Sequence, residues 1–451
     1  MELPQKSDTP RRTEAEQQAF FDATLSRALM AEARVGALVH DLLVADTVVR
    51  LVFAGDKLRS LLLPSLQHLE IPLVSDPGLT LHAWDSETTG IEMLPPPCSQ
   101  ESFTDRGDIW GWNSTRIHSA FHWIECSVNL MDCATKQGIF WVQTARSLPY
   151  WTKASPFRSL LHWWAELNGC QLLHAAAVGY AEGAALITGK GGVGKSTTAL
   201  SCLSAGMLYA GADYVVVRRE PEPRVYSLYN TAKLNPDNAE RFPQFQPLIT
   251  NQPVAEGDKA VISLYPARKL QIAASLSLRV VLTPTVVPQA ETTFHPTSKL
   301  ALQRAAAFTT MSQLPLAGRQ THAYIEALLG QLPGLELRLG HAIDRVPDAI
   351  MHLLAQPPSE VASLAAKGDR ADRRGDAPLV SVIVPVFNGA RFLAGAVDNV
   401  LRQRYPAIEV TLPLTAVIGA AEFDEFLERN GVSRAVTSLP DAEIRAAFLA
   451  G

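Results

Sequence analysis

Apolar residues recur at helical spacing near the start of the chain and at strand spacing further on. The range Ala15–Leu43 carries Phe20, Leu25, Leu29 and Leu42 at intervals that predict a helix. From Val44 the pattern predicts strands separated by proline, glycine and aspartate turns: Thr47–Phe53, Leu79–Trp84, Ile117–Cys126 and Ile139–Thr144. We therefore predict that residues 1–155 form an α+β domain with a helical start.

The tryptophans are unevenly distributed. All eight lie between Trp84 and Trp164, which marks the first third of the chain as distinct from the rest. Indole rings can stack on a sugar or a base. Their large apolar area favours the other interpretation, in which they pack in the core and at sheet edges.

The middle of the chain combines helix and strand patterns. A helix is predicted over residues 156–167, followed by two strands, Leu172–Val178 and Ala184–Thr188, with a turn over residues 179–183. The second strand runs directly into Gly189. Residues 196–205 again have helical spacing, and Gly206 is a suitable C-terminal stop.

A complete phosphate-binding motif lies between that strand and that helix. It reads Gly189-Lys190-Gly191-Gly192-Val193-Gly194-Lys195-Ser196 and satisfies G-x-x-x-x-G-K-[ST]. Glycines let backbone N–H groups point at phosphate oxygens, and the start of the next helix adds positive potential. Lys195 supplies a charge for the outer phosphates, and the Ser196 hydroxyl is placed to ligate Mg²⁺. Together with Thr197, which follows, the motif predicts a site for ATP and Mg²⁺; its flanking strand and helix disfavour a chance match.

Two families have loops of this kind. The partition-type ATPases use the first lysine, here Lys190, across a dimer, but in them the loop usually follows the first strand of the chain. The segments around the present loop resemble the HPr serine kinases, more narrowly the HPr-kinase-related proteins of bacterial peptide and polysaccharide gene clusters: Leu172–Gly179, Gly206–Tyr214 and Tyr226–Leu234. This resemblance implies a kinase domain, placed here at residues 156–356, with a fold similar to the nucleotide domain of phosphoenolpyruvate carboxykinase.

The resemblance also implies roles for individual residues. His174 matches a histidine near the transferring phosphate, and Asp213 matches the second of two adjacent aspartates, which holds Mg²⁺ directly or through water. The first aspartate, the implied general base, is replaced by Ala212, whose methyl group cannot accept a proton. A weak kinase, an ATP-binding regulator and a kinase with another base, His174 or Asp237, all stay open. Purely structural roles are the alternatives for His174 and Asp213.

The last quarter of the chain has a different pattern. Residues 357–377 contain two prolines and mixed charges and predict a linker. Residues 378–411 then resemble the opening of a family 2 glycosyltransferase, on the strand Pro378–Gly389, the helix Ala390–Arg404 and the segment Tyr405–Val410. The aspartates that this family uses for the nucleotide and metal are missing, and the tail 412–451 is too short for the remaining half-sheet. We interpret residues 378–411 as a truncated GT-A-like fragment without sugar transfer; a partner-docking module is the alternative.

Composition and charge limit which partners and which cellular compartment fit this chain. The chain has 451 residues and a net charge of -5, with no basic surface of the kind that nucleic acid needs. Five cysteines without a C-x-x-C pair argue against zinc and disulfides and favour a reducing cytoplasm. The start lacks a signal-peptide pattern, and no apolar run approaches the roughly 20 residues of a membrane helix, so we expect no membrane insertion. The HPr kinases are hexamers, and the resemblance therefore implies a homo-oligomer.

Three functional hypotheses follow for this multidomain α/β chain. The first is ATP-dependent phosphorylation of a hydroxyl on a protein or peptide acceptor. The second is a non-catalytic nucleotide-binding module with a regulatory or assembly role. The third is a glycosyltransferase lineage whose second half has been lost.

Overall fold

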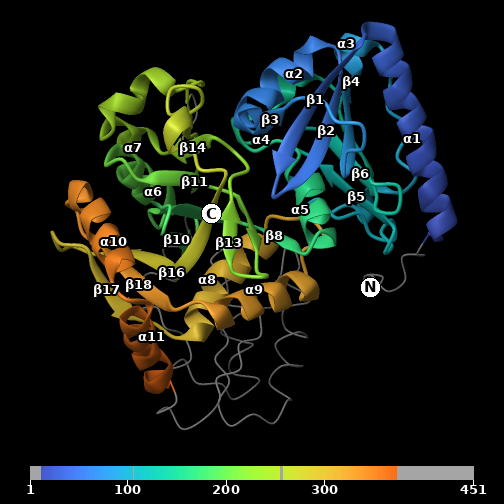
Figure 1. The fold of residues 1–451 in the computed structure, drawn as a ribbon. Coiled ribbons are helices and arrows are strands. Elements are labelled where there is room, and N and C mark those ends of the chain that lie inside the picture. Colours follow the sequence, from blue (N-terminus) through green and yellow to red (C-terminus); the bar gives the residue numbers. More distant parts are fainter. Residues whose placement is uncertain (1–11, 105, 254–256, 373–451) are drawn as a thin grey trace, which may run out of the picture. The chain divides into compact units, whose positions relative to one another are not determined.

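The computed structural model describes residues 12–104, 106–253 and 257–372, and the chain up to Asp369 forms one compact unit (Figure 1). Two large sheets with helices on their faces make up this unit, so the mixed α/β architecture is as predicted. The fragment predicted at residues 378–411 and the tail 412–451 lie outside the described residues. The glycosyltransferase resemblance therefore stays a prediction.

The first sheet contains seven strands in the order β3-β1-β2-β4-β7-β6-β5. The strands are β1 (Ala37–Val44), β2 (Thr47–Ala54), β3 (Glu70–Ile71), β4 (Leu79–Asp85), β5 (Ile117–His122), β6 (Ser127–Asp132) and β7 (Gln137–Val142). The accompanying helices are α1 (Glu14–Val35), α2 (Asp56–Leu62), α3 (Ser86–Thr89), α4 (Tyr150–Ala154) and α5 (Arg158–Leu167). Successive side chains point to opposite faces: Ile139 packs in the cluster with α1, and Phe140 packs in the cluster with α2 and α5. Helices thus cover both faces of this sheet.

The tryptophans of this region serve mainly as core residues. Trp84, Trp163 and Trp164 are fully buried, as the packing interpretation predicted. Trp110 and Trp123 are the most exposed, at 41% and 46%. Burial of whole indole rings gives the first sheet much of its apolar core.

The predicted helix over Ala15–Leu43 is too long. Helix α1 ends at Val35, because Gly36 takes a φ of 91° that breaks the helix, and the chain continues as strand β1. Ala45 and Asp46 then both adopt positive φ, the geometry of a tight two-residue hairpin that pairs Val44 with Thr47. The sequence gives no glycine at this turn, so the hairpin was missed. Two other strands end earlier than predicted, β5 at His122 and β7 at Val142.

The second sheet has nine strands: the path β11-β9-β10-β16-β13-β12-β8, with β18 paired to β16 and β17 paired to β18. Its strands are β8 (Cys170–Leu173), β9 (Ala175–Tyr180), β10 (Gly183–Thr188), β11 (Leu208–Gly211), β12 (Val215–Arg218), β13 (Arg224–Tyr226), β16 (Ser275–Val286), β17 (Thr293–Pro296) and β18 (Gly334–Leu339). A small sheet joins β14 (Thr231–Leu234) to β15 (Ala260–Ser263). The helices are α6 (Lys195–Ser204), α7 (Pro236–Glu240), α8 (Lys299–Met311), α9 (Arg319–Gln331), α10 (Val346–Ala355) and α11 (Pro358–Asp372). Helices α6 and α10 pack on one face of this sheet, and α8 and α9 pack on the other.

Two predictions for this part need correction. The predicted single strand Leu172–Val178 is divided at His174 into β8, which pairs with β12, and β9, which pairs with β10 and β11. Residues 358–372, predicted as part of a linker, form helix α11 instead. Val361 on that helix is 5% exposed and belongs to the core cluster around α6 and α10. Helix α11 has few apolar residues among its charged ones, so the sequence did not predict that one side of it is buried.

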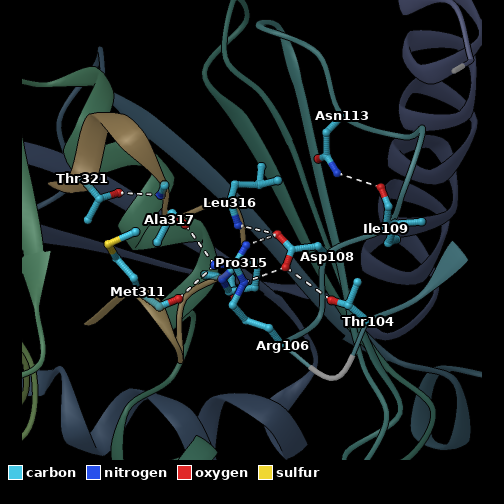
Figure 2. A network of polar contacts seen from close by, with 12 residues as sticks. Thr104, Arg106, Asp108, Ile109, Asn113, Met311, Pro315, Leu316, Ala317 and Thr321 are labelled. Atoms are coloured by element: carbon cyan, nitrogen blue, oxygen red, sulfur yellow. Dashed lines mark hydrogen bonds and ion pairs between the residues drawn. The ribbon is translucent and has the colours of Figure 1, made fainter. Parts of the chain in front are cut away.

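A polar network joins the first sheet to the loop between α8 and α9 (Figure 2). Arg106 donates hydrogen bonds to the carbonyl oxygens of Met311 and Ala317, each at 2.9 Å. The Asp108 carboxylate binds Arg106 and accepts the backbone N–H of Leu316 at 2.6 Å. One hydrophobic cluster also runs from the first sheet through α5 to β8 and β12. The two sheets therefore share a core and a polar contact network.

Candidate phosphate-binding site

The predicted strand, loop and helix are present in that order. Strand β10 leads into Gly189, and helix α6 begins at Lys195. Gly192 and Gly194 adopt φ values of 85° and 103°, which L side chains rarely take. A Cβ atom on Gly194 would lie 2.7 Å from Leu339 Cδ1. The loop conformation therefore depends on glycine at the positions where the motif has it.

Lys195 lies inside the loop. Its side chain is buried, and Nζ donates hydrogen bonds to the carbonyl oxygens of Gly189 at 2.6 Å and Lys190 at 3.0 Å. Burial lowers the pKa of Lys195 to about 8. Lys190 itself is exposed. The structure thus concentrates an ammonium group within a ring of backbone, as a phosphate-binding loop requires.

Ser196 connects the loop to the end of β11. Its Oγ donates a hydrogen bond to the carbonyl oxygen of Ala212 at 3.1 Å. The next residue is Asp213, so the two predicted magnesium ligands belong to adjoining parts of the structure. Thr197 follows in the first turn of α6 and is half-buried. A hydroxyl and a carboxylate are hard oxygen donors of the kind that Mg²⁺ prefers.

Asp213 is the centre of a compact ionic cluster. Its Oδ2 lies 2.5 Å from Lys233 Nζ, and its Oδ1 lies 3.3 Å from His174 Nε2. Ser155 donates a further hydrogen bond to Oδ2 at 3.2 Å. Burial raises the pKa of Asp213, but the charge of Lys233 and the contact with His174 outweigh it and hold the pKa well below its usual range. Asp213 is therefore ionised at neutral pH.

His174 sits at the break between β8 and β9. Its ring stacks on Tyr214, with 5.1 Å between centroids, and its backbone N–H donates to Thr310 Oγ1 at 3.2 Å. Burial lowers the pKa of His174, and Asp213 opposes that shift only in part. Nδ1 is buried and has no hydrogen-bond partner among the described residues. If Nε2–H donates to Asp213, Nδ1 carries a lone pair that is free to accept a proton.

Sequence reasoning missed Lys233 and Ser155. Lys233 lies on β14 and Ser155 just after α4, far from the loop in sequence, and neither type of residue stands out there. Asp237, the other suggested base, is exposed on the first turn of α7, and no hydrogen bond or ion pair within the described part of the chain joins it to Asp213. The structure favours His174 over Asp237 as the group beside Asp213.

The residues fit Mg²⁺ with one condition. Within the described ranges, no group of three or more His, Cys, Asp or Glu side chains could hold a metal ion. Ser196 and Asp213 would therefore need phosphate oxygens and water as further ligands, which is how Mg²⁺ commonly binds with nucleotides. Lys233 already occupies Asp213 Oδ2. Direct coordination there requires Lys233 to move, whereas contact through water does not.

Comparisons with known proteins give little further identification. No protein-family model matches the chain, and no curated protein matches it. Among solved structures, the chain is similar to the HPr(Ser) kinase/phosphatase from Coxiella burnetii, with 12% identity, coverage of 46% of this chain and 99% of that chain, and a TM-score of 0.22. A likeness this low decides neither fold nor function, which rest on the residues described above. No helix in the described ranges combines the length and apolar character that crossing a bilayer demands.

Proposed function

We propose that this chain binds ATP and Mg²⁺ at residues 189–197 and transfers the γ-phosphoryl group to a hydroxyl of a protein or peptide. The observation that carries the proposal is the glycine loop between β10 and α6 with the buried Lys195 ammonium inside it. Such a loop surrounds phosphate oxygens with backbone N–H groups and one mobile positive charge. Ser196 and Asp213 would hold Mg²⁺, which neutralises charge on the phosphates.

The charge balance of the site supports a polyphosphate ligand. Lys195 and Lys233 both lie close enough to Asp213 and to Lys259 for these charges to shift their pKa values. Asp213 is the carboxylate in direct contact with Lys233. Three ammonium groups around one carboxylate leave an excess of positive charge. Because a triphosphate carries several negative charges, it would restore neutrality.

His174 takes the position of the missing base in this proposal. The Ala212 methyl group is buried in the core beside α6, so it offers no proton acceptor. His174 is neutral at physiological pH, because burial lowers its pKa, and its Nδ1 has a free lone pair in the tautomer that donates to Asp213. Nδ1 is buried, so it would accept the hydroxyl proton, as the oxygen attacks the γ-phosphorus and the bond to ADP breaks, only once acceptor binding opens this side of the ring. Asp213 orients the ring and stabilises the imidazolium.

Calorimetry with Mg·ATP tests the binding step. We expect saturable binding by the native protein and its loss in Lys195→Ala, with Lys57→Met, an exposed lysine on α2, as the matched control. Absence of binding by the folded native protein would overturn the proposal. Phosphoryl transfer is then followed with labelled ATP and lysate of the source cell, comparing native protein with Lys195→Ala.

The second candidate, a non-catalytic nucleotide-binding module, is favoured by Ala212 alone. Comparing Ala212→Asp with Ala212→Asn separates the two, because both variants place a polar side chain at the same buried position. If phosphoryl transfer rises steeply in Ala212→Asp but not in Ala212→Asn, the native protein is an impaired kinase. ATP binding without transfer in either variant favours the module. For the glycosyltransferase hypothesis, titration of the full chain with sugar nucleotides is the direct test.

A further inference from the structure

Lys233 occupies a carboxylate oxygen that a metal ion would need. Its Nζ lies 2.5 Å from Asp213 Oδ2, and both side chains are mostly buried. Ser155 donates a hydrogen bond to the same oxygen at 3.2 Å, and His174 Nε2 lies 3.3 Å from Oδ1. Both oxygens of Asp213 are therefore in use, and the shortest contact is the one with an ammonium group. A metal ion can bind Oδ2 directly only where that ammonium group leaves it.

The strand that carries Lys233 places it beside the phosphate site. Its neighbours Ala232 and Leu234 on β14 pack in the same apolar cluster as Leu200 of α6, the helix that follows the loop (Figure 1). Because successive side chains of a strand point to opposite faces, Lys233 points the other way, to Asp213. A lysine has a flexible four-carbon stem, so Nζ can move between two acceptors while the strand stays packed.

The charges around Lys233 disfavour a metal ion that arrives alone. Burial lowers the pKa of Lys233, and the contact with Asp213 opposes that shift. The charges of Arg158 and Lys259 add to the lowering, so both lie close to the ammonium group. A free dication at Asp213 would increase this excess of positive charge. A polyphosphate brings negative charge that offsets the excess, and its oxygens are acceptors for the ammonium group.

We propose that Lys233 makes the site selective for Mg²⁺ that arrives together with a polyphosphate. While its ammonium group contacts Asp213 Oδ2, a free divalent ion is kept from direct coordination there. A terminal phosphate oxygen offers the ammonium group a second acceptor, and this exchange leaves Oδ2 open to the metal ion. The exchange rests on the proposed ATP binding, whereas the exclusion of a free ion does not depend on it.

Electron paramagnetic resonance with Mn²⁺ as the probe tests the exclusion on the full chain without nucleotide. We expect Lys233→Met to bind Mn²⁺ at least about tenfold more tightly than the native protein, because a buried positive charge no longer opposes the ion. Lys57→Met, an exposed lysine on α2, is the matched control and should show no gain. Lys233→Arg keeps the charge and should bind Mn²⁺ as weakly as the native protein. Equal affinity of the native protein and folded Lys233→Met overturns the proposal, as does a gain in Lys233→Arg.

A second substitution shows where the manganese ion binds. Asp213→Asn in the Lys233→Met background should remove the gain, because a neutral amide is a much weaker ligand than a carboxylate. A gain that persists there would place the ion elsewhere and contradict the proposal. If Lys233→Met does not fold, Lys233→Gln, which keeps a polar side chain without the charge, must show the same gain. Its absence in folded Lys233→Gln counts against the proposal in the same way.

ATP titrations by calorimetry separate this inference from the proposed function. With divalent ions removed by a chelator, we expect Lys233→Met to lower ATP affinity about tenfold, because one charged contact to phosphate is lost. With Mg²⁺ present the loss should be smaller, because Asp213 is then free to hold the ion. Equal losses under both conditions would refute the exchange. Failure of the folded native protein to bind Mg·ATP sinks the kinase proposal alone, and the Mn²⁺ titration still decides whether Lys233 excludes a free ion.

Discussion

Replacing Lys233 by methionine perturbs the ionic cluster at its shortest contact. Lys233 Nζ lies 2.5 Å from Asp213 Oδ2, and the two side chains are 12% and 15% exposed. Removing one partner of a buried ion pair typically costs about 3 to 5 kcal/mol, because the other charge stays buried without compensation. His174 and Ser155 still contact Asp213 in the variant. We therefore expect Lys233→Met to lower the free energy of unfolding by about 2 to 3 kcal/mol, somewhat below that range.

A double-mutant cycle in urea isolates the pairwise contribution. Asp213→Asn, Lys233→Met and the double variant are unfolded in parallel at neutral pH. We expect the double variant to be more stable than the sum of the single losses predicts, by about 2 kcal/mol, since contacting residues do not behave additively. Lys57→Met on the exposed face of α2 controls for loss of a lysine and should change stability by about 0.5 kcal/mol or less. Additive losses would refute the reasoning, because they would mean that Lys233 and Asp213 do not stabilise each other.

Three other predictions concern the loop, the network in Figure 2 and a buried histidine. Gly194→Ala places a methyl group 2.7 Å from Leu339 at a φ of 103°, so Mg·ATP affinity by calorimetry should fall sharply while circular dichroism stays native. Arg106→Met removes two hydrogen bonds to the loop between α8 and α9. Each such bond to a charged group contributes about 1.5 to 3 kcal/mol to stability, so the variant should speed proteolysis of that loop. Burial lowers the pKa of His162 to about 3, so the unfolded chain binds a proton below pH 6.5 that the folded chain does not. Stability should therefore fall by about 1.4 kcal/mol per pH unit from this group on acidification from pH 6.5 toward 3, and His162→Phe should remove that part of the slope in urea titrations.

The sequence predicted the elements with strong local signals. The phosphate loop, its flanking strand and its helix follow from one short motif, because glycine placement and chain direction fix their geometry. The hairpin at Ala45 and Asp46 was missed because alanine gives no left-handed signal at the first turn position and no glycine follows Asp46, although aspartate itself tolerates that conformation. Helix α11 was missed because its burial depends on packing against α10 and α6, which no local pattern reveals.

The site was predictable only where its residues carry a motif. Lys195 and Ser196 are placed by the loop, and Asp213 was reached through the family resemblance. Lys233 and Ser155 reach Asp213 from distant segments, so their contacts depend on tertiary packing rather than on spacing in the chain. The contacts of a buried charge follow from its need for a partner, but the sequence does not say which partner it finds.

The first sheet acts on the phosphate site through the loop between α8 and α9. Thr310 Oγ1, in the last turn of α8, accepts a hydrogen bond from the backbone N–H of His174. In the following loop, Gln313 Oε1 accepts a hydrogen bond from the hydroxyl of Tyr214. Arg106, from the first sheet's side, binds the carbonyl groups of Met311 at the end of α8 and of Ala317 near the end of this loop (Figure 2). Asp108 holds the same loop through the backbone N–H of Leu316, so a change at Arg106 or Asp108 is expected to reach both aromatic rings beside Asp213. The predicted domain boundary at residue 155 falls between the strands of the first sheet and those of the second. The position of His174 nevertheless depends on contacts from both sheets.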